Sequence, residues 1–245
     1  MMRIRLLYLS CLSMLCIVTA QINSAQADQS NWTEEKVGKL AVKADRAATR
    51  KKWSLAIKYG EKMLKGSAVL YEVNDPTYIT HLKNLNRYYD KFGRLTEVAG
   101  RVKLAYELAK AHLDPSHSVA TTCRVLYYKL LITQKKYPKA IPVVYLNMST
   151  LTKSKDDQFR KLHYYRQLYA LYGLTEQLEK EEQALLNYIH LHENLIGKLK
   201  ANDNLKGDKD DVLILKRLIQ NYCRRKMPDK IKVLTKKYDL KYTCN

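Results

Sequence analysis

Glycine, proline and phenylalanine are scarce in this chain of 245 residues, which contains 8 Gly, 5 Pro and 2 Phe. Short alternating runs rich in β-branched residues, which would predict strands, are also scarce. The sequence has no glycine-rich loop of the kind that cradles a phosphate. Leu, Ala, Lys, Glu and Tyr dominate instead. These deficits disfavour a sheet-based fold and favour an all-α one.

A long apolar run is missing as well. The most apolar stretch, LLYLSCLSMLCIVTA at 6–20, is shorter than the roughly 20 residues that a membrane-spanning helix needs. Two arginines precede it, and the small residues Ala25 and Ala27 follow it, which is typical of a cleaved signal peptide. We therefore expect residues 1–27 to be a signal peptide, with an uncleaved N-terminal anchor as the alternative.

Cysteine is sparse, and the spacing of the cysteines predicts neither a metal site nor a definite disulfide pairing. Cys11 and Cys16 lie in the expected signal peptide, and neither follows the small residues that bacterial lipid attachment requires. Cys123, Cys223 and Cys244 would remain after cleavage, and an odd number leaves at least one thiol without an intrachain partner. Their spacing matches no zinc site. An oxidising compartment would permit a Cys223–Cys244 disulfide, but sequence spacing leaves that pairing open.

Positive charge is abundant: 44 Lys or Arg stand against 24 Asp or Glu, a formal net charge of +20. Such a chain attracts anions, which include nucleic acid, anionic lipid, anionic polysaccharide and acidic protein. The expected export disfavours nucleic acid. A second interpretation is that the lysines only keep helical surfaces solvated.

Apolar residues recur three and four positions apart, which predicts amphipathic helices. Leu82, Leu85 and Tyr89 form such a stripe in HLKNLNRYYDKFG, and KLHYYRQLYALYG at 161–173 repeats the pattern. Turns are expected at NDPT (74–77) and LDPS (113–116), and at Gly93 and Gly173.

Two stretches nearly repeat each other, KKWSLAI at 51–57 and KKYPKAI at 135–141. Alignment on Ala56 and Ala140 places Val98 midway and Leu178 beyond, so the four anchors step by 42, 42 and 38 residues. A weaker fifth copy is centred near Ile231. Each copy predicts helix, turn, helix, with the anchor early in the second helix. Such hairpins bury their apolar faces only by stacking, which predicts a solenoid.

The repeated pattern resembles a tetratricopeptide repeat (TPR) lengthened to about 42 residues. The second copy carries the resemblance best, with positions at Leu82, Leu85, Tyr89, Gly93, Leu95, Val98 and Ala105. The resemblance implies an α-α superhelical solenoid of about four helical hairpins over 28–196. A polar loop (197–210) and a basic C-terminal helix pair (211–245) should follow it.

In the resembling family, the first helices of the hairpins line a concave groove that binds peptide. Measured from each anchor, the groove positions implied here are Lys83, Arg87, Lys91, Lys129, Arg160, His163 and Gln167. Five of these seven are cationic. Such a groove would suit an acidic protein segment or a C-terminal carboxylate.

No constellation of residues predicts catalysis, and we expect neither an enzyme nor a cofactor or metal site. His190 and His192 are two residues apart, which points them to different sides of a helix. The carboxylates of EKEEQ at 179–183 are expected to form a solvated face.

The sequence therefore predicts an exported scaffold or assembly factor that binds another protein. A bacterial periplasm is the favoured compartment and secretion the second, since glycosylation sequons begin at Asn31 and Asn147. The alternative is a surface-acting protein that binds an anionic envelope component, either a polymer or a membrane. That binding would use a basic patch at Arg224, Arg225 and Lys226.

Overall fold

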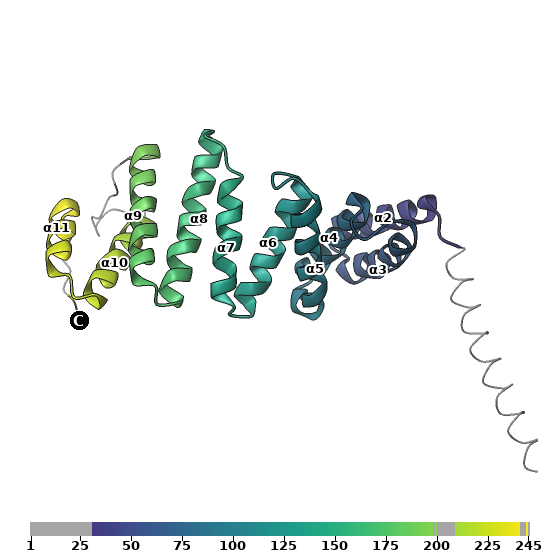
Figure 1. Ribbon diagram of the computed structural model, residues 1–245, viewed down its shortest axis with the longest axis horizontal. Coiled ribbons are helices and arrows are strands. Elements are labelled where there is room, and N and C mark those ends of the chain that lie inside the picture. Colours follow the sequence, from purple (N-terminus) through teal and green to yellow (C-terminus); the bar gives the residue numbers. More distant parts are fainter. Residues whose placement is uncertain (1–30, 198, 200–208, 241–243, 245) are drawn as a thin grey trace, which may run out of the picture. The chain divides into compact units, whose positions relative to one another are not determined.

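A computed structural model describes residues 31–197, 199, 209–240 and 244. The expected signal peptide and most of the predicted polar loop lie outside these residues. The described residues form α-helices and one short 3₁₀ helix, with no strand (Figure 1). They divide between Leu126 and Tyr127, inside α6 (Ser118–Thr133), into two compact units.

Unit 1 contains two helical hairpins and the first half of α6. Its elements are α2 (Glu34–Thr49), α3 (Trp53–Leu70), α4 (Pro76–Lys91), η1 (Leu95–Val98) and α5 (Ala99–His112). Side chains at the helix starts satisfy backbone N–H groups that lack intrahelical partners. The side chain of Thr33 accepts from the N–H of Lys36 at 3.2 Å, and Asp75 accepts from Thr77 at 2.6 Å.

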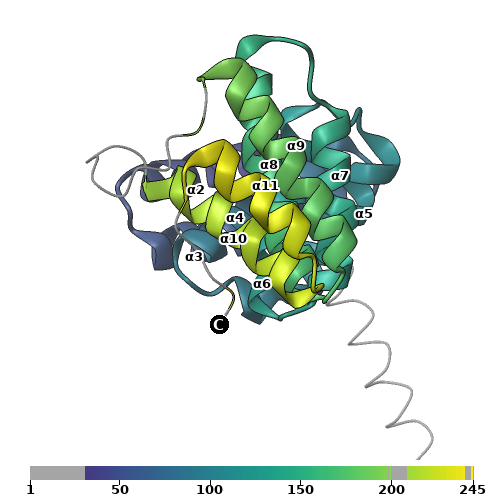
Figure 2. The same cartoon turned by 90° about the vertical axis from the view of Figure 1, so that its left-hand side faces the viewer.

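Unit 2 continues the same alternation of helices. Its elements after α6 are α7 (Tyr137–Ser149), α8 (Lys155–Leu174), α9 (Leu178–Leu195), α10 (Lys209–Arg224) and α11 (Pro228–Tyr238). Pro138 and Pro228 lie in the first turn of their helices, where a proline costs no hydrogen bond, while Pro142 lies inside α7. Figure 2 shows α11 in front of α9 and α10.

The same turn closes five helical hairpins. A residue with positive φ follows the first helix of each hairpin, at Lys51, Gly93, Lys135, Glu176 and Lys226. The next residue donates its N–H to the carbonyl five positions back, as in Lys52 to Ala47 and Met227 to Tyr222. This is the Schellman arrangement that ends many helices. The first four turns are 42, 42 and 41 residues apart, so the sequence repeat is a structural repeat.

The turns correct the fourth anchor. The anchor lies five residues after each turn residue, which confirms Ala56, Val98 and Ala140 and places the fourth at Glu181 rather than Leu178. Gly173 was expected in that turn, but it lies inside α8, and Glu176 adopts the positive φ instead. The prediction was wrong because it took the nearest glycine as the turn residue.

Each unit has its own apolar core. In unit 1, the side chains between α2, α3 and α4 include Ala44, Ala56 and Leu85, each fully buried. The small alanines allow the helices to approach closely. In unit 2, Leu185 on α9 packs with Leu218 and other side chains of α10 in one apolar cluster. Within each unit, this packing fixes the positions of the helices and of their exposed faces.

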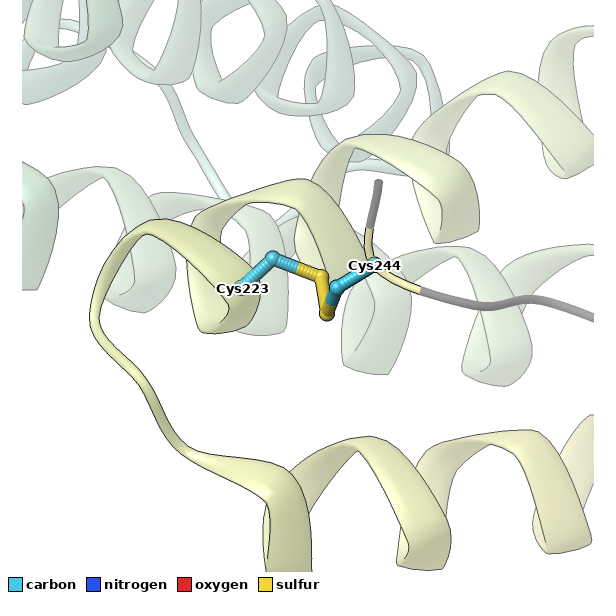
Figure 3. Close-up of a disulfide and its surroundings, with 2 residues drawn as sticks. All are labelled: Cys223 and Cys244. Atoms are coloured by element: carbon cyan, nitrogen blue, oxygen red, sulfur yellow. A yellow bond between two sulfur atoms is a disulfide. The ribbon is translucent and has the colours of Figure 1, made fainter.

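A disulfide joins the last hairpin to the chain that follows it. Cys223 near the end of α10 bonds to Cys244, with Cα atoms 5.7 Å apart (Figure 3). This resolves the pairing that the sequence left open. Cys123 in α6 is free and buried.

Candidate functional site

Three of the predicted groove residues lie on α4, next to a carboxylate that sequence analysis did not include. Arg87 and Lys91 are exposed, and Lys83 is half-buried. Nη2 of Arg87 lies 3.9 Å from Oδ1 of Asp45 on α2, and the hydroxyl of Tyr88 donates to the same oxygen at 2.6 Å. Asp45 lies six residues before the turn residue Lys51, and Arg87 lies six residues before the turn residue Gly93. The two therefore occupy equivalent positions in successive hairpins. The first-helix face of unit 1 is therefore of mixed sign at this position.

The environment of Lys83 favours the approach of an anion. Burial lowers the pKa of the Lys83 ammonium, and the positive charge of Arg87 lowers it further, against weaker opposing effects of Cys123 and Asp45. Within the described part of the chain, no carboxylate lies within ion-pair distance of Lys83. A bound carboxylate would stabilise this partly desolvated charge.

The remaining predicted groove residues lie in unit 2. Lys129 is exposed on α6. Arg160, in the second turn of α8, is exposed and forms an ion pair of 3.5 Å with the half-buried Asp157. Farther along the same helix, Nε2 of Gln167 and Nε2 of His163 lie 2.9 Å apart and share a hydrogen bond.

The corrected turn changes which residues of α8 correspond to those of α4. Because the fourth anchor is Glu181, the equivalents of Lys83, Arg87 and Lys91 are Arg166, Ala170 and Leu174. Arg166 donates to the hydroxyl of Tyr188 at 3.0 Å, and its guanidinium lies over that ring. Leu174 is 57% exposed. The first-helix face is therefore less basic on α8 than on α4.

Two carboxylates of EKEEQ are buried, so the expected solvated face is wrong for Glu181 and Glu182. The side chain of Glu181 is 1% exposed and accepts hydrogen bonds from Arg217 at 2.6 Å and Asn221 at 3.0 Å. Gly173 makes room for this pair, since a Cβ there would lie 2.6 Å from Oε1 of Glu181 and would overlap Arg217.

The predicted basic patch at the C-terminal end faces these carboxylates. Arg225 pairs with Glu182 and lies 3.3 Å from Glu179, and only 14% of its side chain is exposed. Arg224 lies 3.9 Å from Glu181, while Lys226 is exposed in the turn. Similar pairs join α11 to α9, where Lys230 bonds to Glu182 at 2.6 Å and Lys237 to Glu193 at 3.3 Å. Much of the positive charge of α10 and α11 is therefore paired with the carboxylates of α9.

The histidines lie singly. His192 is buried and stacked on Tyr188, with ring centroids 5.8 Å apart, and His190 shares a hydrogen bond of 3.2 Å with Asn194. His81 shares a 2.6 Å hydrogen bond with Ser67, and burial lowers its pKa. Among the described residues, no group of three or more His, Cys, Asp or Glu could hold a metal ion.

None of the helices in the described ranges combines the length and the apolar character that crossing a bilayer requires.

No protein-family model and no curated protein matches the sequence, but solved structures resemble the fold. The TPR-like repeats of a protein assigned as a kinesin light chain in Podospora anserina match with a TM-score of 0.56 and 11% identity, over 84% of this chain and 96% of that one. The MamA protein matches with a TM-score of 0.54 and 14% identity, over 86% and 100%. BtubC from P. vanneervenii matches with 0.54 and 16% identity, over 89% and 92%.

These similarities confirm the predicted fold class, an all-α TPR-like solenoid. Solenoids of this class place helical hairpins side by side and commonly bind other proteins. At such low identities the likeness extends to the fold alone.

Proposed function

We propose that the protein is an exported protein–protein interaction scaffold or assembly factor that binds an acidic partner segment along the first helices of its hairpins. The observation that carries the proposal is the α4 face, where Lys83, Arg87 and Lys91 occur at successive turns. Only Asp45 opposes them in the described ion pairs. A carboxylate-bearing segment could form charge-assisted hydrogen bonds with all three side chains.

The proposed site is centred on unit 1. In unit 2, Lys129, Arg160, His163 and Gln167 are proposed as partner-binding residues of that unit, with Arg166 added by the corrected register. A binding role is proposed rather than an enzymatic one, because stacked helical hairpins commonly form extended binding surfaces.

The Cys223–Cys244 disulfide supports export, because structural disulfides persist mainly in oxidising compartments. We infer a signal peptide at 1–27 and a periplasmic location, with secretion as the second possibility. The C-terminal basic surface is less suited to an anionic polymer or membrane, because Arg225, Lys230 and Lys237 already pair with carboxylates of α9.

The test is chemical crosslinking of the chain in its native cell envelope, followed by identification of the captured proteins by mass spectrometry. The variant Arg87→Glu/Lys91→Glu reverses two exposed charges of α4 while leaving half-buried Lys83 in place. Its matched control, Lys103→Glu/Lys110→Glu, makes the same charge change at exposed positions of α5 in the same unit.

We expect one or two dominant partners, whose capture falls by about tenfold or more in the α4 variant and is unchanged in the control. Equal capture by the two variants would contradict the proposed site. Retention on anionic glycan or lipid with no captured protein would contradict the proposed function.

A further inference from the structure

The first hairpin contains a recess that the proposed function does not use. It lies between α2 and the C-terminal half of α3 and has a volume of about 640 Å³. This volume falls within the roughly 300–1,000 Å³ of small-molecule sites. Five lysines line it: Lys36, Lys39, Lys43, Lys62 and Lys65. Their spacing of three and four residues brings them to one side of each helix.

One wall of the recess is held in place by packing. The ring of Trp32 lies against Gly66, where a Cβ would come within 2.7 Å of Cζ3, and Val37 packs at the same point. The ammonium of Lys36 lies 4.7 Å from the centre of the Trp32 ring and donates to the carbonyl of Asn31 at 3.1 Å. Trp32 and Lys36 thus have defined positions before any ligand arrives, which reduces the entropy lost on binding.

Lysine and arginine outnumber the acidic residues in the first hairpin. Residues 34–70 contain ten Lys or Arg and four Asp or Glu. Two of these carboxylates are directed elsewhere, since Asp45 contacts Arg87 and Tyr88 while Glu61 contacts Arg101 at 2.8 Å. Glu35, which lines the recess, pairs with Lys39.

We propose that this recess binds an oligosaccharide that carries sulfate, phosphate or carboxylate groups. The lysines supply ammonium donors to the anionic groups, and Glu35 supplies an acceptor for sugar hydroxyls. Because the lysines line a hollow, a chain of sugar rings can reach them more readily than a flat bilayer can. The apolar lining residues Trp32 and Leu40 are half-buried, so they do not project as membrane-inserting side chains.

Trp32 provides a direct probe of binding. The chain has only one other tryptophan, Trp53, so the Trp53→Phe variant of the full chain reports on Trp32 alone. Its fluorescence would be titrated with a sulfated tetrasaccharide prepared from heparin, at about 0.15 M salt. Parallel titrations would use inorganic phosphate and vesicles of phosphatidylglycerol with phosphatidylcholine.

Two triple variants in this background separate the recess from general charge. Lys39→Gln/Lys43→Gln/Lys62→Gln removes three charges from the recess, and Arg50→Gln/Lys52→Gln/Lys58→Gln removes three exposed charges of the same hairpin that do not line it. We expect saturable tetrasaccharide binding that weakens by about tenfold in the recess variant and less than about threefold in the other. Thermal unfolding would confirm that both variants fold.

Three results would overturn the inference. One is the absence of a saturable fluorescence change with the tetrasaccharide, and another is an equal loss of affinity in both triple variants. The third is a response to phosphate or anionic vesicles that matches or exceeds the response to the tetrasaccharide. None of these depends on Arg87 or Lys91, so this inference and the proposed function fail separately.

Discussion

A single buried carboxylate distinguishes the fourth hairpin from the others. The anchor position holds fully buried alanines at Ala56 and Ala140, where two helices approach closely. At Glu181 the same position holds a charge, which is stable there because Arg217 and Asn221 both donate to it. Gly173, on the neighbouring helix, leaves the space that the larger side chain needs.

This arrangement predicts that Gly173→Ala destabilises the protein although alanine favours helices. The new Cβ would displace Arg217 from Glu181 and leave a buried carboxylate incompletely paired, so we expect a loss of about 2–3 kcal/mol in the free energy of unfolding. Urea denaturation followed by circular dichroism measures it.

Gly38→Ala is the matched control, because Gly38 lies inside α2 with no atom within 4 Å of a new Cβ. This variant should gain about 0.5–1 kcal/mol from helix propensity alone. If both variants gave a gain, Gly173 would have no role in accommodating the buried pair.

At the scale of elements, the turns explain how much of the fold the sequence could predict. All five hairpin turns share one hydrogen-bond pattern, but only Gly93 has glycine at the positive-φ position. Lys51, Lys135, Glu176 and Lys226 adopt that conformation because the Schellman bonds and helix packing outweigh its cost of roughly 1–2 kcal/mol. The spacing of helices was therefore predictable, and the exact fourth turn was not.

The candidate site was predictable only in part, for the same reason. For α4, the groove positions were counted from a correct anchor, Val98, and they include the exposed Arg87 and Lys91. On α8 the wrong anchor shifted the register by three residues and missed Arg166. Asp45 was missed because no groove position was transferred to the first hairpin, and the buried pairs of Glu181 depend on contacts between residues 36 and 40 positions apart.

Ion pairs between helices make the C-terminal hairpin sensitive to acid. Burial alone would raise the pKa of Glu182, but Lys230 and Arg225 outweigh it and hold the pKa below its ordinary value of 4.5. A carboxyl whose pKa is lower in the folded state stabilises the protein above its unfolded pKa. That stabilisation is lost as the pH falls from about 4.5 through the folded value.

Glu182→Gln should therefore reduce the free energy of unfolding at pH 7 by about 1–3 kcal/mol, and the difference from the wild type should shrink as the pH falls below about 4.5. Denaturant titrations at a series of pH values provide the measurement. Glu179→Gln, which changes a carboxylate that is 77% exposed, should have an effect below about 1 kcal/mol at every pH. A constant difference for Glu182→Gln across the series would rule out its ion pairs as the cause.

At the scale of the whole molecule, a net charge of +20 does not imply a uniformly basic surface. The C-terminal helices contribute many cations, but Arg217, Arg225, Lys230 and Lys237 contact carboxylates of α9. In the first hairpin Lys and Arg outnumber Asp and Glu, and two of its carboxylates contact α4 and α5. Anionic partners are therefore better sought on unit 1 than at the C-terminal end.

The state of the cysteines tests both export and the fold in one measurement. Cys223 and Cys244 are joined, and burial raises the pKa of the Cys123 thiol to about 11, which keeps it unreactive in the folded protein. Removal of residues 1–27 would also remove Cys11 and Cys16. Protein purified from an oxidising compartment should then contain one free thiol and one disulfide per chain.

We expect maleimide to label Cys123 slowly under native conditions and completely in denaturant, with intact mass showing one label before reduction and three after it. Retention of the N-terminal segment with free thiols would give three labels before reduction and five after, together with the mass of the uncleaved chain. Three labels before reduction on a chain that lacks residues 1–27 would contradict the disulfide. Because mass and label number are read from the same molecules, the measurement separates failure of the export proposal from failure of the disulfide.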